Sequence, residues 1–483
     1  MRLQRPCRRL AACLGTLLFA CACLRADTIV LKNGRKIFAL SVTEQGDKIQ
    51  YETASGTLTL PKSIVDHVER GPKPGSYAEA AANLSITPPS LESMGIASAG
   101  NLIEQGAVHD GMIDRDFIAT VEVEARSGGR SERESAALAH HVAAQFEMTH
   151  GDMDHALADE RTALSFAPDQ SALLMNVAYL HLRRSEFKQS LDYLDRARRI
   201  SPNNADVAKL LGWAYYGLNR LDQAVGEWKR AQALRSDPEV QAALDKALKD
   251  KAEEESYKEN ESPHFTLRYS GSSEPELARE VLRTLESHYS AIESELRFST
   301  PDPVGVVLYT KQAFADTTNA PDWVSALNDG RIRVPVQGLT TMTPDLARVL
   351  KHELTHSFVQ QKTHGRAPTW LQEGLAQWME GKRSNISAAP LLQIYEAKQA
   401  VSLSELEGSW MKFTSNKGSY AYAWSLANVE MIIQTNGTGD IERVLDRVAA
   451  GEPTESALRT VLHSDYDDLM QSTAEYLRRT YVR

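Results

Sequence analysis

Two short segments in the C-terminal half of the chain hold residues whose types and spacing can support metal chemistry. The first is His-Glu-Leu-Thr-His at residues 352–356, in which His352 and His356 lie four positions apart. On a helix, these histidines share one face and can bind one metal ion, while Glu353 reaches a water molecule at that ion. The second segment, Trp-Leu-Gln-Glu-Gly-Leu-Ala at residues 370–376, offers Glu373 as a third ligand. Hydrolytic zinc sites need three protein ligands, one open position and a general base.

The local sequence predicts a helix for the histidine box. Thr343 suits the N-cap and Pro344 the first helical position, and His364-Gly365 provides a stop signal. Between them apolar residues recur at helical spacing, namely Leu346, Val349, Leu350, Leu354 and Phe358. A second helix is expected to begin at Pro368-Thr369 and to bring Glu373 back across the first.

Glu380 competes with Glu373 for the place of third ligand. The two carboxylates lie seven positions apart on the same helix face, which is about 11 Å of rise, so only one can contact the metal. Gly374 beside Glu373 is small and would allow this helix to approach the first one closely. Glu380 is followed by Gly381, Lys382 and Arg383, where the helix is expected to end in solvent. We therefore predict that Glu373 is the ligand and that Glu380 has little effect.

The two segments resemble the gluzincin class of zinc peptidases, in particular bacterial peptidase-MA-like domains with H-E-x-x-H and W-L-x-E-G-x-A motifs. The resemblance covers residues 263–483. It implies an α+β zincin peptidase domain with His352, His356 and Glu373 as Zn²⁺ ligands. It also implies that Glu353 is the general base that takes a proton from the attacking water and gives it to the leaving amine.

Three positions separate this chain from related patterns. Metzincins have Gly and His where this chain has Val359 and Lys362, which argues against that class. Many gluzincins place an acid four residues after the ligand glutamate to orient a histidine, and Gln377 stands there. An amide can accept a hydrogen bond from an imidazole but raises its basicity less, so zinc affinity is expected to be modest.

Other segments of this domain have predicted roles as well. Residues 304–309 are apolar and β-branched and predict a buried strand, whereas residues 331–336 alternate and contain Pro335, as in a half-exposed edge strand. Such an edge can pair with an extended peptide, or it can be an ordinary outer strand. The resemblance implies that Tyr420 or Tyr422 holds the oxyanion; simple packing is the alternative.

The first 26 residues read as an export signal, with several arginines followed by an apolar run from Leu10 to Leu24. Cleavage after Ala26 would remove all four cysteines and leave a chain without disulfides, either periplasmic or secreted. Membrane attachment is expected only if Cys21 or Cys23 is lipidated. Removing this segment changes the net charge from −10 to −15, which argues against nucleic-acid binding.

Residues 27–70 contain five short β-rich runs, with an Asn33-Gly34 hairpin turn between the first two, and predict a small barrel-like module. Residues 71–133 are rich in proline, glycine and serine and are expected to form a linker with some local structure.

Residues 134–248 repeat with a period of 34, the period of tetratricopeptide repeats. Two prolines, Pro168 and Pro202, are separated by this interval, and small residues recur with it, as at Ala144, Ala178 and Gly212. About three helix pairs are expected to form an all-α solenoid that binds a protein partner or the substrate. Residues 249–262 are charged and are expected to link the solenoid to the peptidase domain.

The sequence thus predicts a multidomain exported protein that hydrolyses peptides or proteins with Zn²⁺. The alternative is a non-catalytic envelope scaffold or assembly protein that uses the repeats and a metal-binding zincin domain. The intact Glu353 favours the enzyme, whereas Gln377 favours the scaffold.

Overall fold

The computed structural model describes residues 27–32, 36–39, 41–45, 48–53, 56–69, 100–270, 275–318, 326–336, 338–408, 410, 413 and 415–482. The predicted export signal, its cleavage site and the cysteines lie outside these residues, as does the Asn33-Gly34 turn. The chain divides into two compact units, one with the N-terminal strands and one with all the elements from α2 to the C-terminus.

The described residues of the first unit contain six strands, β1(Asp27–Leu31), β2(Lys36–Ala39), β3(Ser41–Gln45), β4(Lys48–Thr53), β5(Gly56–Pro61) and β6(Val65–Glu69), with a 3₁₀ turn η1(Lys62–Ile64) before the last. They form two three-stranded antiparallel sheets, in the orders β2-β1-β6 and β3-β4-β5. The strand β3 was not predicted. A barrel-like closure of the two sheets stays a prediction.

The second unit begins with elements that pack on the first long helix. These are α2(Gly100–Ala107), the small hairpin β7(Val108–His109) and β8(Met112–Ile113), and α3(Arg115–Ser127), which precede α4(Arg130–Thr149). Ala107 and Ile118 share a buried cluster with Ala139 and Ala143 of α4. This is the local structure within residues 71–133 that the structure describes.

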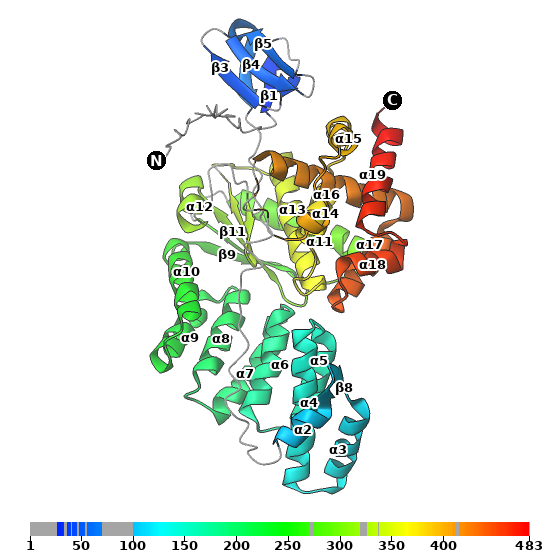
Figure 1. Ribbon diagram of the computed structural model, residues 1–483. Helices are drawn as coiled ribbons and strands as arrows, with labels where there is room; N and C mark the ends of the chain where they lie inside the picture. The colour runs from blue at the N-terminus through cyan, green and yellow to red at the C-terminus, as the bar shows by residue number, and fades with distance from the viewer. Residues whose placement is uncertain are drawn as a thin grey trace, which may run out of the picture. The chain divides into compact units, whose positions relative to one another are not determined.

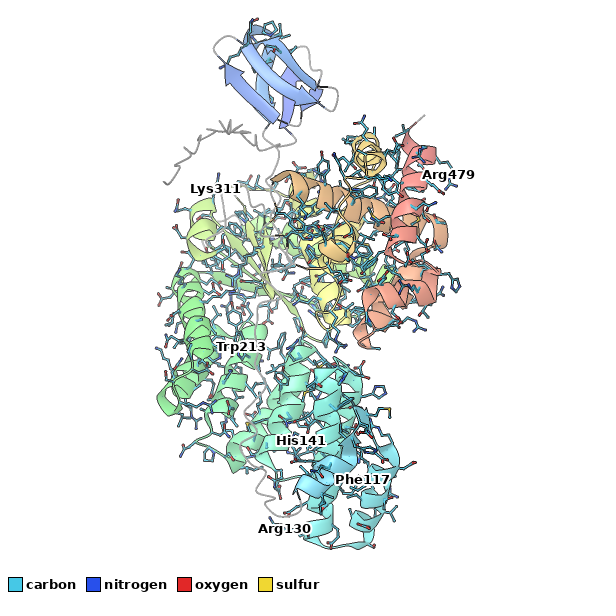
Figure 2. All side chains as sticks on the ribbon, in the orientation of Figure 1. Phe117, Arg130, His141, Trp213, Lys311 and Arg479 are labelled. Carbon is cyan, nitrogen blue, oxygen red and sulfur yellow. The ribbon has the colours of Figure 1, made fainter. Side chains whose placement is uncertain are left out.

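Three successive helix pairs follow (Figure 1): α4 with α5(Met153–Phe166), α6(Ser171–Arg183) with α7(Phe187–Ile200), and α8(Ala205–Gly217) with α9(Leu221–Leu234). A final helix, α10(Pro238–Glu254), packs on α9. The small residues recur because the paired helices touch there: a Cβ on Gly212 would lie 2.3 Å from Nε1 of Trp228. Trp213, labelled in Figure 2, meets Trp228 edge-on with ring centroids 4.9 Å apart.

The turns inside the three pairs contain Gly151, Ser185 and Asn219, all in the left-handed region with φ of 82°, 60° and 60°. These turn positions keep the 34-residue period and lie on the same edge of the solenoid. That edge contacts the C-terminal domain, because Lys188 N donates to Asp302 Oδ2 at 3.1 Å and the Asn219 side chain lies over Gly305.

A five-stranded mixed sheet forms the centre of the C-terminal domain, in the order β12-β13-β11-β10-β9. Its strands are β9(Lys258–Glu261), β10(Phe265–Tyr269), β11(Val304–Tyr309), β12(Leu327–Asn328) and β13(Arg331–Pro335). The three inner strands are parallel to one another, and both edge strands run antiparallel to them. The predicted buried strand at residues 304–309 is β11, and all its residues are buried.

The prediction of a half-exposed edge strand at residues 331–336 is wrong. The strand β13 lies inside the sheet and is buried along its whole length, and β12 is the edge beside it. Arg331 and Arg333 produce the polar alternation, but each is 1 % exposed because acidic side chains surround both guanidinium groups. Pro335 is the last residue of β13, where a missing N–H costs least.

Helices cover this sheet and complete the domain: α11(Pro275–Leu296), α12(Lys311–Thr318), α13(Pro344–Lys362), α14(Thr369–Met379), α15(Ala388–Glu396), α16(Ser415–Asn436), α17(Thr438–Ala449), α18(Thr454–Leu462) and α19(Tyr466–Tyr481), with a short 3₁₀ turn η2(Ser404–Leu406). One hydrophobic core runs from β10 and β11 through α13 and α14 to α19. Among the described residues, none of the helices has the length and apolarity to cross a bilayer.

Candidate metal centre

The first helix of the site, α13, begins and ends as its sequence predicts. Thr343 is the N-cap and its side chain accepts a hydrogen bond from Leu346 N at 3.1 Å, with Pro344 at the first helical position. Two residues with positive φ, His364 at 52° and Gly365 at 74°, turn the chain after Lys362. The apolar stripe through Leu350, Leu354 and Phe358 is fully buried, which fixes the rotation of the helix and so the face that carries the histidines.

The second helix, α14, is held from its other side by α16. A Cβ on Gly374 would lie 2.4 Å from the carbonyl oxygen of Ser425, so only glycine permits this approach. The sequence analysis assigned this small residue to contact with the first helix; its close neighbour is instead α16. Gln377 strengthens the same contact, because its Nε2 donates to the carbonyl oxygen of Tyr422 at 2.9 Å and to that of Glu373 at 3.1 Å.

The structure brings His352, His356 and Glu373 together, with one possible ligand atom from each within 4.8 Å of the others. The two Nε2 atoms are 3.2 Å apart, and Glu373 Oε2 lies 3.6 Å from that of His352 and 3.7 Å from that of His356. Ligand atoms about 2.0–2.1 Å from a tetrahedral zinc ion are about 3.3 Å from one another. The triangle is therefore the right size for zinc.

Several buried polar atoms of this cluster lack a hydrogen-bond partner among the described residues. Glu373 is 0 % exposed, yet neither carboxylate oxygen has a hydrogen-bond partner among the described residues, and the same holds for Glu353 Oε2 and His356 Nδ1. Leaving a buried carboxylate without a partner is costly, and native structures avoid it unless a cation or water is bound there. The donor set of two imidazoles and one carboxylate suits zinc.

The pKa values of the metal-free cluster show the same shortage of positive charge. Burial lowers the pKa of His352, but Glu373 and Glu380 outweigh that effect and raise it to about 10. Burial raises the pKa of Glu353 to about 7 and lowers that of His356 to about 4. One imidazole thus keeps a proton to balance two buried carboxylates, a charge that a metal ion would supply instead.

Glu380 lies inside the site, whereas the sequence analysis expected the helix to end in solvent at this residue. It is the C-cap of α14, its side chain is 7 % exposed, and Oε1 lies 3.3 Å from Nδ1 of His352. A carboxylate at the second nitrogen of a ligand histidine fixes the ring and raises its basicity. Lys382 Nζ contacts the same oxygen at 2.7 Å. Glu380 therefore occupies the orienting position for which the sequence analysis considered Gln377.

The two tyrosines considered for the oxyanion lie on α16. The ring of Tyr422 meets Trp410 edge-on at 5.1 Å, and its carbonyl oxygen accepts from Gln377 as described above. Tyr420 is partly buried against the same core. These contacts place both residues on the helix that supports α14. The role of either hydroxyl toward an oxyanion stays a prediction.

Comparison with protein families agrees with this architecture. Residues 300–479 match the model described as Peptidase MA superfamily, and residues 181–247 match a model described as Tetratricopeptide repeat. The C-terminal part of the chain thus carries a Peptidase MA superfamily domain and the helical region before it carries tetratricopeptide repeats. No curated protein matches the chain.

Proposed function

We propose that this protein is a zinc-dependent peptidase of the gluzincin type, with His352, His356 and Glu373 as the metal ligands. The observation that carries the proposal is the buried triangle of ligand atoms 3.2–3.7 Å apart, one corner of which is a carboxylate without a hydrogen-bond partner among the described residues. The match to the Peptidase MA superfamily supports the same class of reaction.

The residues of the chain would divide the work of hydrolysis as follows. When bound, zinc supplies a Lewis acid that acidifies water and polarises the scissile carbonyl. Glu353 takes the proton from the attacking water and delivers it to the leaving amine. Glu380 holds the ring of His352, and α16 holds α14 in place through Gly374 and Gln377.

Metal analysis of the purified protein tests the first step of this proposal. We expect one zinc per chain, loss of peptide hydrolysis on chelation, and recovery when zinc is returned. His356→Ala should abolish stoichiometric zinc, whereas His364→Ala, a histidine just past the end of the same helix and outside the ligand cluster, should retain it. Wild-type protein that takes up no zinc on reconstitution would end the proposal.

The repeats offer a second candidate function, a scaffold that assembles proteins and uses the metal only for structure. Protein interaction is the usual use of stacked repeats, and we propose that they bind the substrate or a protein partner here. The two functions differ in what Glu353 does. If the protein is a scaffold, Glu353→Gln should keep both partner binding and stability. The wild-type protein should then cleave no member of a peptide library.

We further propose that the protein is exported and begins at or near Asp27 when mature. The arginines and the apolar run of the first 26 residues support this. Intact-mass measurement of protein from cell fractions decides the point. Retention of Met1 in a cytosolic fraction would contradict export, and a diacylglyceryl mass on Cys21 or Cys23 would show membrane attachment.

A further inference from the structure

A buried cluster of charges joins the last repeat helix to the sheet of the peptidase domain. Asp250 and Glu254 project from α10, and Arg331 and Arg333 from β13; each of these side chains is 1 % exposed. Arg333 donates from Nη1 and Nη2 to the two oxygens of Asp250 at 2.8 and 2.7 Å, and such a paired contact fixes both distance and orientation. Arg331 donates from Nη2 to both oxygens of Glu254 at 2.8 and 2.6 Å.

The same cluster reaches the hairpin turn between β12 and β13. Asp329 accepts from Arg333 Nε at 3.0 and 3.1 Å and from Lys246 of α10, and it is 3 % exposed. Lys246 of α10 therefore contacts the turn, and Asp250 of the same helix contacts the strand β13. Gly330, with φ of 95°, completes the turn, and its N–H donates to Asn328 Oδ1 at 3.2 Å.

Asn328 connects the turn to α13, the helix of the metal centre. Its Nδ2 donates to the carbonyl oxygen of Glu353 at 2.9 Å and to Ser357 Oγ at 2.7 Å, and the residue is 1 % exposed. Glu353 is the proposed general base, and Ser357 follows the ligand His356. One amide group thus bridges the edge of the sheet and the central turn of α13, where small displacements alter the position of the base.

We propose that Asn328 is a positioning residue for Glu353. The repeat helix α10 sets the position of Asn328, because Lys246 and Asp250 of this helix hold Asp329 and Arg333. The repeats are then a structural part of the active centre, and occupancy of the repeats by a partner has a physical route to the catalytic base. The activity part of this inference rests on the proposed function. Its structural part, the coupling of α10 to α13, does not.

Two variants test the two ends of the route. Asn328→Asp keeps the shape but removes the N–H donor, and should lower kcat by about 10–100-fold with little change in KM, since a small misplacement of a catalytic group has an effect of that size. Lys246→Met keeps the aliphatic stem and removes the charge beside Asp329, and should lower kcat by about threefold, as for mutations along a coupling route. Zinc content should stay at the wild-type level in both.

Matched controls separate positioning from general loss of stability. Asn176→Ala removes another buried asparagine, 2 % exposed and bonded to Glu160 within the repeats, and should leave kcat unchanged. Lys249→Met removes an exposed lysine from the same helix as Lys246 and should also leave it unchanged. If Asn328→Asp is insoluble, Ser357→Ala removes one of the two acceptors from the helix side and carries the same test.

Hydrogen exchange of the backbone amides in α13 provides a readout without activity. Asn328→Asp and Lys246→Met should speed exchange around Glu353 and Ser357, while both controls should not. Wild-type kcat and exchange in Asn328→Asp would overturn the inference, and equal behaviour of Lys246→Met and Lys249→Met would overturn the part played by the repeats. If the two variants show the exchange effect but the wild-type protein hydrolyses no peptide, the proposed function alone is contradicted.

Discussion

The peptidase domain buries two clusters of charged side chains, and the two differ in how their polar atoms are satisfied. In the cluster between α10 and β13, every carboxylate oxygen of Asp250, Glu254 and Asp329 has a hydrogen-bond partner. In the metal centre, both oxygens of Glu373 and one of Glu353 have none among the described residues. Both clusters are largely buried, so burial alone does not distinguish a site from a scaffold. The carboxylates differ: those of the first cluster are all paired, whereas the oxygens of Glu373 lack hydrogen-bond partners and lie beside two imidazoles, where a cation can supply the missing charge.

The comparison predicts different consequences for losing a carboxylate. A carboxylate of the satisfied cluster neutralises arginines, so its removal leaves charges buried and costs stability. A carboxylate of the metal centre acts on a ligand or on water, so its removal costs function. The predictions below run from the largest expected effect to the smallest.

Glu353→Gln should lower kcat/KM for peptide hydrolysis by about 10³-fold or more, because an amide cannot accept the proton of the attacking water. Zinc content and thermal stability should remain near those of the wild type. Glu430→Gln is the matched control, because Glu430 is 1 % exposed and bonds only structural partners such as Ser384 N and Tyr476 OH. Steady-state kinetics with metal analysis measures both variants. Near wild-type turnover in Glu353→Gln would assign the base to another residue.

Asp250→Asn should lower the free energy of unfolding by about 3–5 kcal/mol, because it leaves Arg331 and Arg333 short of a buried counter-charge. Glu373→Gln should abolish zinc binding but change the stability of the metal-free protein little, since functional groups are commonly held at a cost to stability. Urea unfolding of both variants in chelator measures the contrast. A larger loss of stability in Glu373→Gln than in Asp250→Asn would break the distinction between the two clusters.

Glu380→Ala should weaken zinc binding by about 10–100-fold, the usual effect of removing a carboxylate that orients a ligand histidine. This replaces the sequence-based prediction of little effect, because Glu380 lies 3.3 Å from Nδ1 of His352. Glu396→Ala is the control: Glu396 is the last residue of α15 and pairs with Arg478 at the surface. Competition titration with a zinc-binding dye gives the affinities. Equal affinity of Glu380→Ala and wild type would return Glu380 to a surface role.

Features that depend on neighbouring residues could be predicted from the sequence. The N-cap Thr343, the stop at His364-Gly365 and the 34-residue spacing of small residues are all local patterns, and the structure shows each of them. The close approach of His352, His356 and Glu373 followed from helical spacing and one short connection.

Features that depend on distant partners could not be predicted from the sequence. Arg331 and Arg333 have the alternation of an exposed strand. Besides the local Asp329, their burial depends on Asp250 and Glu254, some 80 positions earlier. Glu380 precedes charged neighbours that suggest solvent, yet its carboxylate lies 3.3 Å from Nδ1 of His352.

The smallest predicted effect concerns pH and again separates the clusters. Burial would raise the pKa of Asp250 and Asp329, but the charge of Arg333 outweighs it, so both lie below the ordinary value of 3.8. A carboxyl whose pKa is lowered by folding stabilises the protein fully above its unfolded pKa, and this contribution is lost as pH falls through the folded pKa. The difference in unfolding free energy between wild type and Asp250→Asn should therefore be constant from about pH 5 to 8 and shrink below about pH 4.

Urea unfolding in chelator across this pH range tests the sign. Asp245→Asn is the control on the same helix, because Asp245 is exposed and bonded only to Gln241 among the contacts seen. Its unfolding free energy should follow that of the wild type at every pH. If the deficit of Asp250→Asn instead grew as the pH fell below 4, the aspartate would be neutral in the folded protein. The arginines would then be balanced by Glu254 and Asp329 alone, and the cluster would be incompletely paired like the metal centre.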